Sequence, residues 1–201
     1  MLLIRHSMTE GNSYGRYIGA RTDEPLCEKG RELLKSFSYP EVEKVFVSPM
    51  LRCRQTAESF FPGQELFVEE LLRECDFGAF ENKNYIELSG DSRYQEWMDS
   101  NGTLPFPDGE SKEGFQKRCK EGFCRCLEVC EKEKIQKAAF VVHGGTVMSI
   151  LDAYTDTGKQ YYEWMLKNAE AYEIEVDETT WEKNRTVKVL GKYTGEGFET
   201  L

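Results

Sequence analysis

The sequence lacks long hydrophobic runs, linkers and repeats. No apolar run approaches the length of a membrane span, and the apolar start ends at Arg5, without the longer core and small-residue cleavage site of a secretory signal. No stretch rich in proline, glycine or serine divides the 201 residues, and no segment is repeated or of low complexity. We therefore expect one domain spanning residues 1–201 in a soluble, cytoplasmic protein without membrane contacts.

The sequence also lacks an excess of positive charge. It has 26 basic and 36 acidic residues, a net charge of −10, which repels nucleic acid and acidic membrane surfaces. Any anion site must therefore be a local basic pocket. The seven cysteines are odd in number and accompany no export signal, which favours reduced thiols over a disulfide scaffold.

Short apolar runs alternate with helical patterns along the chain, which predicts an α/β fold. Three runs, at residues 2–4, 45–47 and 138–142, are continuous and apolar, as expected of strands buried on both faces. Ligands in open α/β sheets bind beyond the carboxyl ends of the strands, so the segments that follow these runs should converge on one crevice. Those segments are Arg5-His6, Ser48-Pro49 with Arg52, and His143-Gly144-Gly145.

The remaining patterns predict helices, further strands and an insertion. Ser48 and Pro49 are typical of a capping residue and the first position of a helix, which would carry Arg52 on its first turn. Segments 171–176 and 186–190 nearly alternate and predict edge strands. A longer helix is predicted over about 111–134, because apolar residues recur there at steps of three and four: Phe115, Cys119, Phe123, Cys126 and Cys130. This spacing favours core packing of the cysteines over a metal cluster.

Residues from about 73 to 111 are punctuated by glycine and proline, which predicts a loop-rich insertion over the strand ends. Loops in such positions commonly shape substrate pockets. Aromatic side chains of the insertion would supply a hydrophobic wall: Phe77, Phe80, Tyr85, Tyr94 and Trp97.

The two histidines of the chain each follow a predicted core strand, and their neighbours suit phosphoryl transfer. That chemistry needs neutralisation of phosphate charge, a nucleophile or a positioned water, and a proton for the leaving oxygen. An imidazole nitrogen can attack phosphorus to give a phosphohistidine. Guanidinium groups such as those of Arg5 and Arg52 clamp phosphate, and Gly144 at a helix start offers an open backbone N–H. A carboxylic acid of suitable pKa would complete the set.

These residues lie in ordered motifs that resemble the histidine phosphatase superfamily, the phosphoglycerate mutase-like clan. The resemblance runs from Ile4 to about Leu151. The motifs are Arg5-His6-Ser7-Met8-Thr9-Glu10-Gly11-Asn12, Gly15-Arg16-Tyr17-Ile18-Gly19, Ser48-Pro49-Met50-Leu51-Arg52, Leu72-Arg73-Glu74-Cys75-Asp76-Phe77-Gly78, Pro107-Asp108-Gly109-Glu110-Ser111 with Arg118, and Val142-His143-Gly144-Gly145. The resemblance implies a three-layer α/β/α sandwich with a mostly parallel central sheet.

The resemblance also implies roles for individual residues. His6 would be the nucleophile and Glu74 the proton donor, with Arg5, Arg52 and His143 forming the phosphate pocket. Around the substrate we place Asn12, Ser7, Gly19 and Gly144. The family needs no metal or cofactor. Outside the motif, Glu74 would be interpreted as a solvated loop carboxylate, and Arg54 is interpreted as an exposed helix residue. Glu110 and Ser111 could be no more than a loop residue and a helix cap, but we expect them to have a secondary role in the site.

Three positions depart from the family pattern: Ser7 and Asn82 replace glycine, and Met148 stands where arginine is common. The mutases usually carry His-Tyr-Gly after the acid, where this chain has Asp76-Phe77-Gly78 preceded by Cys75. A phosphatase acting on a small phosphorylated metabolite is therefore favoured. The motifs look most like those of the α-ribazole phosphatases of cobalamin assembly. The alternatives are a broad-specificity phosphatase, a phosphoglycerate mutase, or an inactive protein that binds a phosphorylated ligand.

Overall fold

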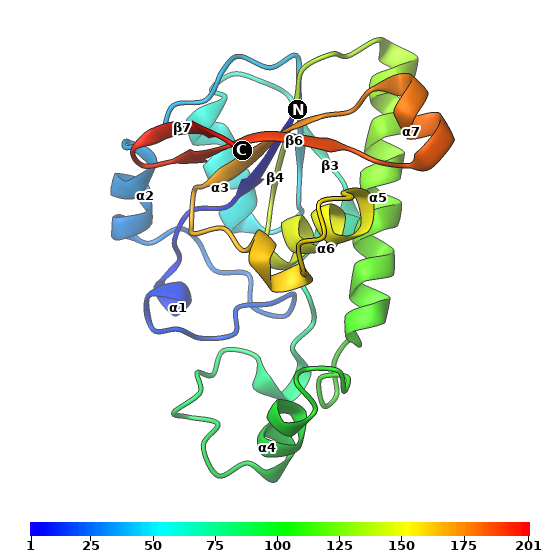
Figure 1. Cartoon of the computed structure of the whole chain (residues 1–201). Helices are drawn as coiled ribbons and strands as arrows, with labels where there is room; N and C mark the ends of the chain where they lie inside the picture. The colour runs from blue at the N-terminus through cyan, green and yellow to red at the C-terminus, as the bar shows by residue number, and fades with distance from the viewer.

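The three apolar runs of the sequence form adjacent strands in the computed structural model, which describes residues 1–201 (Figure 1). They are β1 (Leu2–Arg5), β2 (Lys44–Val47) and β4 (Ala138–Val142). Across the seven-stranded sheet the order is β3-β2-β4-β1-β5-β6-β7. The other strands are β3 (Leu66–Val68), β5 (Ala171–Glu175), β6 (Lys188–Thr194) and β7 (Gly197–Thr200).

The sheet has a parallel and an antiparallel half. Strands β3, β2, β4 and β1 pair in parallel, whereas β5, β6 and β7 are joined to β1 and to each other in antiparallel fashion. The predicted α/β class is confirmed. The prediction of a mostly parallel sheet holds for the half that contains all three predicted core strands.

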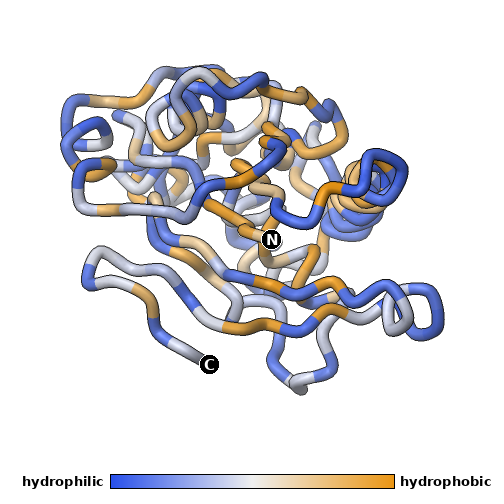
Figure 2. The backbone as a smooth tube through the Cα atoms, turned by 90° about the horizontal axis from the view of Figure 1, so that it is seen from above, coloured by the Kyte–Doolittle hydropathy of each residue, from blue (hydrophilic) through white to orange (hydrophobic).

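Helices cover both faces of the sheet, as predicted for a three-layer sandwich. Helices α5 (Lys112–Glu133) and α6 (Gly144–Tyr154) cover one face, where they pack on alternate strand residues such as Leu3 and Phe140. Helix α3 (Leu51–Phe60) covers the other, against Ile4 and Val141, with α2 (Glu28–Leu34) beside it. Figure 2 shows the apolar residues concentrated in the strands and the helix faces toward them. Smaller elements are α1 (Glu10–Ser13), η1 (Glu70–Leu72), η2 (Gly78–Phe80), α4 (Ser92–Asp99), η3 (Tyr161–Trp164) and α7 (Glu178–Asn184).

Helix α5 confirms the prediction over 111–134. Ser111 caps its start by accepting a hydrogen bond from the Gly114 amide, and Lys134 ends it in the left-handed conformation. The five residues of its predicted apolar face are all buried, among them three of the seven unpaired cysteines. No helix in the chain combines the length and apolar character that crossing a membrane would need.

Two predictions about these elements are wrong in part. Helix α3 begins at Leu51 after Met50, not after Ser48. The Ser48 hydroxyl does accept from the Met50 amide at 3.4 Å, as a capping residue would, and it also lies 2.7 Å from His143 Nε2. Arg52 does lie on the first turn. Strands β5 and β6 are interior, since β5 pairs with β1 and β6 with β7. The edges are the short strands β3 and β7, which have no clear apolar alternation.

Residues 73–111 contain only η2 and α4 between irregular segments, and they lie beyond the carboxyl ends of the parallel strands (Figure 1). Their aromatic side chains largely pack on one another and on Tyr17, whereas Tyr85 is exposed. The rings around Tyr17 are Phe77, Phe80, Tyr94, Trp97 and Phe106. This cluster attaches the insertion to the segment after α1. The insertion as a cover of the site stays a prediction.

Candidate active site

His6 follows β1 and is held in the form that a nucleophile requires. Its Nδ1 lies 2.6 Å from the carbonyl oxygen of Ser7, and because a carbonyl only accepts, Nδ1 carries the ring proton. Nε2 therefore keeps its lone pair. Burial, followed by the charges of Arg52 and Arg5, holds the pKa of His6 well below its usual 6.5, so the ring is neutral.

His143 follows β4 and lies beside His6, as the parallel pairing of β1 and β4 predicts. The two ring centroids are 5.2 Å apart, edge to face. His143 Nε2 lies 2.7 Å from the Ser48 hydroxyl and 3.5 Å from the thiol of Cys53. Its pKa is also well below the usual value, first because the ring is buried and then because Arg52 is near. A bound phosphate would oppose this effect of the cations.

The guanidinium groups of Arg5 and Arg52 make the local basic pocket that the acidic composition requires. Arg5 donates from Nη1 to the carbonyl of Leu166 at 2.5 Å. Arg52, fully buried, donates to the carbonyls of Thr22, Ile18 and Gly19. In both side chains the buried Nε has no hydrogen-bond partner within the protein. Each guanidinium is thus anchored through a terminal nitrogen, and its buried Nε–H remains free to donate to an anion.

Glu74 is buried in the same site rather than solvated. Its Oε1 accepts from the Cys75 amide at 3.0 Å, and its Oε2 lies 3.9 Å from His143 Nδ1. Burial raises the pKa of Glu74 above its usual 4.5, outweighing the Cys75 N–H and the charge of Arg52, which lower it. A carboxyl group with a raised pKa holds its proton, as a general acid must.

The predicted substrate-binding residues have different surroundings. Asn12 accepts at Oδ1 from the Asn168 side chain, which also donates to the His6 carbonyl. The Gly19 carbonyl anchors Arg52. Gly144 opens α6, and a Cβ atom there would lie 3.4 Å from Arg5 Nε, so glycine admits the guanidinium to the helix start. Contact of these three residues with substrate stays a prediction.

Ser7, the fourth of the predicted residues, is hydrogen-bonded within the protein. Its hydroxyl donates to the carbonyl of Gly30 at 2.7 Å, and its amide donates to Thr56 Oγ1 at 3.0 Å. Both donors have partners within the protein and anchor the loop after β1, and contact of Ser7 with substrate stays a prediction. Asn82, another departure from the family's glycine, has a φ of 56°, which asparagine tolerates better than most residues.

Sequence reasoning missed two groups of site residues. Ser48 and Cys53 contact His143, although the sequence pattern around Ser48 is typical of a helix cap. Asn168 precedes β5, and because β5 runs antiparallel to β1, its start lies at the same sheet edge as the end of β1. A polar residue just before the strand predicted over 171–176 would have been a signal only if the antiparallel direction of that strand had been known.

The site contains no cluster suited to a metal ion. Three carboxylates elsewhere come within 4.8 Å of one another, those of Glu131, Glu178 and Glu182, and all three are exposed. They lie on α5 and α7, at the end of the molecule opposite α4 (Figure 1). Exposed acidic groups of this kind are common without an ion.

The chain is similar to phosphatases and to a phosphoglycerate mutase. The Hydrogenobacter thermophilus protein named "Putative phosphoserine phosphatase 2" is 32% identical over 167 residues, 79% of each chain. A solved α-ribazole phosphatase from Shigella flexneri covers 94% of this chain and 93% of its own with a TM-score of 0.76, but at 20% identity it shows the fold alone. A phosphoglycerate mutase structure from Thermus thermophilus is 30% identical over 94% of this chain and 95% of that chain, with a TM-score of 0.67.

The family assignment rests on nearly the whole chain and not on the motifs alone. Residues 1–188 match a single family, so the match includes the antiparallel strand β5 that lies outside the sequence motifs. Within it, two neutral histidines face two anchored arginines and a buried carboxyl group. The chain therefore belongs to the histidine phosphatase superfamily (branch 1).

Proposed function

We propose that the protein is a metal-independent phosphomonoesterase that works through a phosphohistidine at His6. The observation that carries the proposal is the state of His6: a neutral ring with its proton fixed on Nδ1 toward the Ser7 carbonyl, beside two guanidinium groups that each keep a free Nε donor. A residue that bound phosphate only as a cation would need an imidazolium, which this buried site disfavours.

The proposed reaction has two steps. In the first, Nε2 of His6 attacks phosphorus, the bond from phosphorus to the ester oxygen breaks, and Glu74 gives its proton to that oxygen. In the second, the Glu74 carboxylate takes a proton from water while the water oxygen attacks the phosphohistidine. The phosphorus–nitrogen bond breaks, and phosphate and neutral His6 result. Arg5, Arg52 and His143 hold the phosphate oxygens through both steps.

The proposed substrate is a small phosphorylated metabolite, with α-ribazole 5′-phosphate as the first candidate. Two features support it: the resemblance of the motifs, and the aromatic residues Phe77 and Phe106, which lie next to the Glu74 segment and are only partly buried. Phosphoserine is the second candidate, because the 32% identical relative carries that name. A mutase is the alternative suggested by the T. thermophilus structure.

The test is phosphate release, with a chelator present, from α-ribazole 5′-phosphate, phosphoserine, 3-phosphoglycerate and p-nitrophenyl phosphate. We expect one metabolite to be preferred and His6→Ala to lose more than about 10⁴-fold in kcat/KM. An acid-labile phosphoenzyme should form in the wild type and not in His6→Ala. The phosphomonoesterase proposal would be abandoned if no substrate released phosphate, or if 3-phosphoglycerate were isomerised instead of hydrolysed. Binding of the same compounds without turnover would favour an inactive binding protein.

A further inference from the structure

Arg118 on α5 uses its whole guanidinium inside the protein. Nε donates to Glu110 Oε1 at 2.9 Å, and Nη1 donates to the carbonyls of Leu71 and Arg73, both at 2.8 Å. Nη2 donates to the Glu74 carbonyl at 3.2 Å and to Glu110 Oε2 at 2.7 Å. A guanidinium has five N–H donors, and here each has one acceptor. No donor is left over, so Arg118 is not a further phosphate ligand like Arg5 and Arg52.

The acceptors of Arg118 belong to the segment that carries Glu74. Three of them are backbone carbonyls at or just before Glu74. Glu110 fixes the other side, because its amide donates to the Asp76 carbonyl at 2.9 Å and its Oε2 accepts from the Asp76 amide at 3.3 Å. The Glu74 backbone is thus held on both sides by one ion pair, whose side chains are 10% and 19% exposed.

The Glu74 carboxyl group itself has few hydrogen bonds that could hold it. Its one hydrogen bond is with the amide of the next residue, Cys75. Its slot is narrow, since a Cβ atom on Gly145 would come within 2.8 Å of Glu74 Oε1. The position of the carboxyl group therefore depends on the backbone that presents it, and a proton donor must lie within hydrogen-bond reach of the oxygen it protonates.

We propose that Arg118 and Glu110 form a positioning pair that places the proton of Glu74 at the leaving-group oxygen. The inference rests on the proposed role of Glu74 as the acid. The bidentate geometry of the pair is strong and directional, which suits it to fixing a loop. The pair acts on the acid and not on the phosphate pocket, so its loss should matter in proportion to how much the leaving group needs a proton.

The experiment compares esters that differ in leaving group. p-Nitrophenolate leaves readily without a proton, whereas the alkoxide of phosphoserine or β-glycerophosphate does not. For Arg118→Met we expect a loss of about 100-fold in kcat/KM with the alkyl phosphates and less than about threefold with p-nitrophenyl phosphate. Glu74→Gln should give the same pattern with a larger loss. Inhibition by inorganic phosphate, which reports on the pocket, should stay the same in Arg118→Met.

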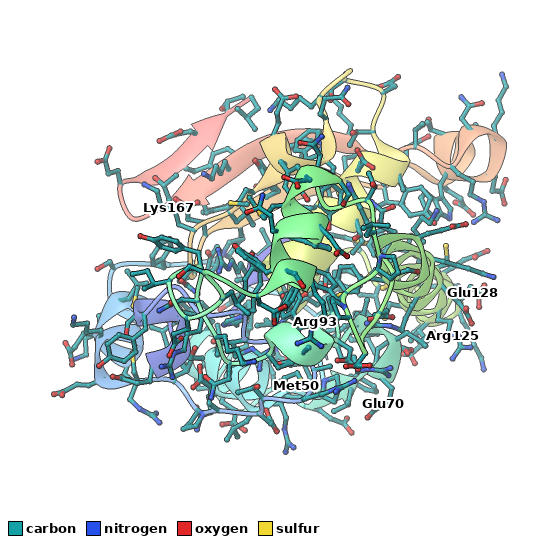
Figure 3. The ribbon with its side chains drawn as sticks, turned by 90° about the horizontal axis from the view of Figure 1, so that it is seen from below. Met50, Glu70, Arg93, Arg125, Glu128 and Lys167 are labelled. Atoms are coloured by element: carbon teal, nitrogen blue, oxygen red, sulfur yellow. The ribbon has the colours of Figure 1, made fainter.

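Two further variants guard against a general folding defect. Glu110→Gln keeps the size of the side chain and weakens the pair, so it should show the same leaving-group pattern at about tenfold. Arg125→Met is the matched control, because Arg125 lies on the outer face of the same helix and pairs with Glu121 at 2.6 Å (Figure 3). It should change neither substrate class.

Each outcome separates the two proposals. If Arg118→Met and Glu110→Gln lose kcat/KM equally on all esters, the pair has a merely structural role and the inference fails while the proposed function stands. If both variants match the wild type while Glu74→Gln loses alkyl phosphates selectively, the inference alone fails. If Glu74→Gln shows no dependence on the leaving group, Glu74 is not the acid, and the proposed mechanism falls together with the inference.

Discussion

The parallel half of the sheet leads into the candidate site, whereas the antiparallel half ends in an exposed hairpin. In the parallel half, β1, β2 and β4 end at one edge and pass directly to His6, to the Arg52 helix and to His143. In the antiparallel half, β6 and β7 form a hairpin whose last strand is exposed along its whole length. Figure 2 shows the C-terminal segment away from the apolar centre of the molecule.

The difference shows how strand direction selects where chemistry can gather. Parallel strands bring all their carboxyl ends to one edge, so the segments that follow β1, β2 and β4 all supply site residues. In a hairpin, successive strands end at opposite edges of the sheet, so fewer of their carboxyl ends reach the site. The exception is the start of β5, which reaches the site because β5 runs opposite to β1. The predictions below test this division, beginning with the largest effect.

Phe140→Ala should destabilise the protein by about 3–5 kcal/mol, since Phe140 is fully buried in β4 and packs on Phe46 and Phe123 with centroids 5.1 and 5.2 Å apart. Urea unfolding measures the change in the free energy of unfolding. A loss below about 1 kcal/mol would contradict the view that the parallel half carries the core.

The pH profile of kcat/KM should reflect the two opposite shifts within the site. His6 must be neutral to attack, and its lowered pKa keeps it neutral below pH 6.5, so activity should persist on that side. Glu74 must be protonated to act as the acid, and its pKa is raised by burial. As the pH rises above the pKa of Glu74, kcat/KM should therefore fall by about tenfold per pH unit. In Glu74→Gln the alkaline fall should be absent with an alkyl phosphate. A profile that rises toward alkaline pH in the wild type would contradict these assignments.

Asn168→Ala should lower kcat/KM by about tenfold. The change removes two hydrogen bonds, one to the His6 carbonyl and one to Asn12, each of which contributes about 0.5–1.5 kcal/mol. Steady-state kinetics with the preferred substrate gives the value. Unchanged kinetics would mean that the antiparallel half has no part in the site.

Phe198→Ala should have the smallest effect, below about 1 kcal/mol in stability and none on kcat/KM. Phe198 is 45% exposed, and its ring covers Gly191 and Tyr193 on the neighbouring strand. The same unfolding and kinetic measurements apply. Loss of activity here would show that the hairpin and the site are coupled.

The sequence predicted the parallel half well because its signals are local. Continuous apolar runs mark β1, β2 and β4, and a three-to-four spacing marks α5. Tertiary context decided the rest. Ser48 is followed by proline as a helix cap often is, and its hydroxyl does accept from the Met50 amide, but it also bonds to His143, which is 95 residues away. Strand β7 has too little apolar pattern to be found, and the edge position predicted for β5 is wrong because alternation does not reveal which neighbour a strand pairs with.

Among the site residues, the motif order located His6, Arg5, Arg52, Glu74 and His143, and the fold brings all five together. Burial could not be predicted for Glu74, because Arg73 and Asp76 close to it are charged. Nor could the sequence show that the Ser7 hydroxyl would be bonded to Gly30. Both outcomes depend on segments that are distant along the chain.

That distance has a consequence for how the protein acquires its activity. Arg5 is hydrogen-bonded to Leu166, which lies 161 positions later in the chain, and His6 to Asn168, which lies 162 positions later. The N-terminal residues that would carry the chemistry are therefore synthesised first but reach their final positions only when the C-terminal part of the chain has folded. Contacts of such long range form slowly because the intervening chain must first be closed into a loop. In a refolding experiment, catalytic activity should therefore return no earlier than the burial of the core tryptophan Trp164.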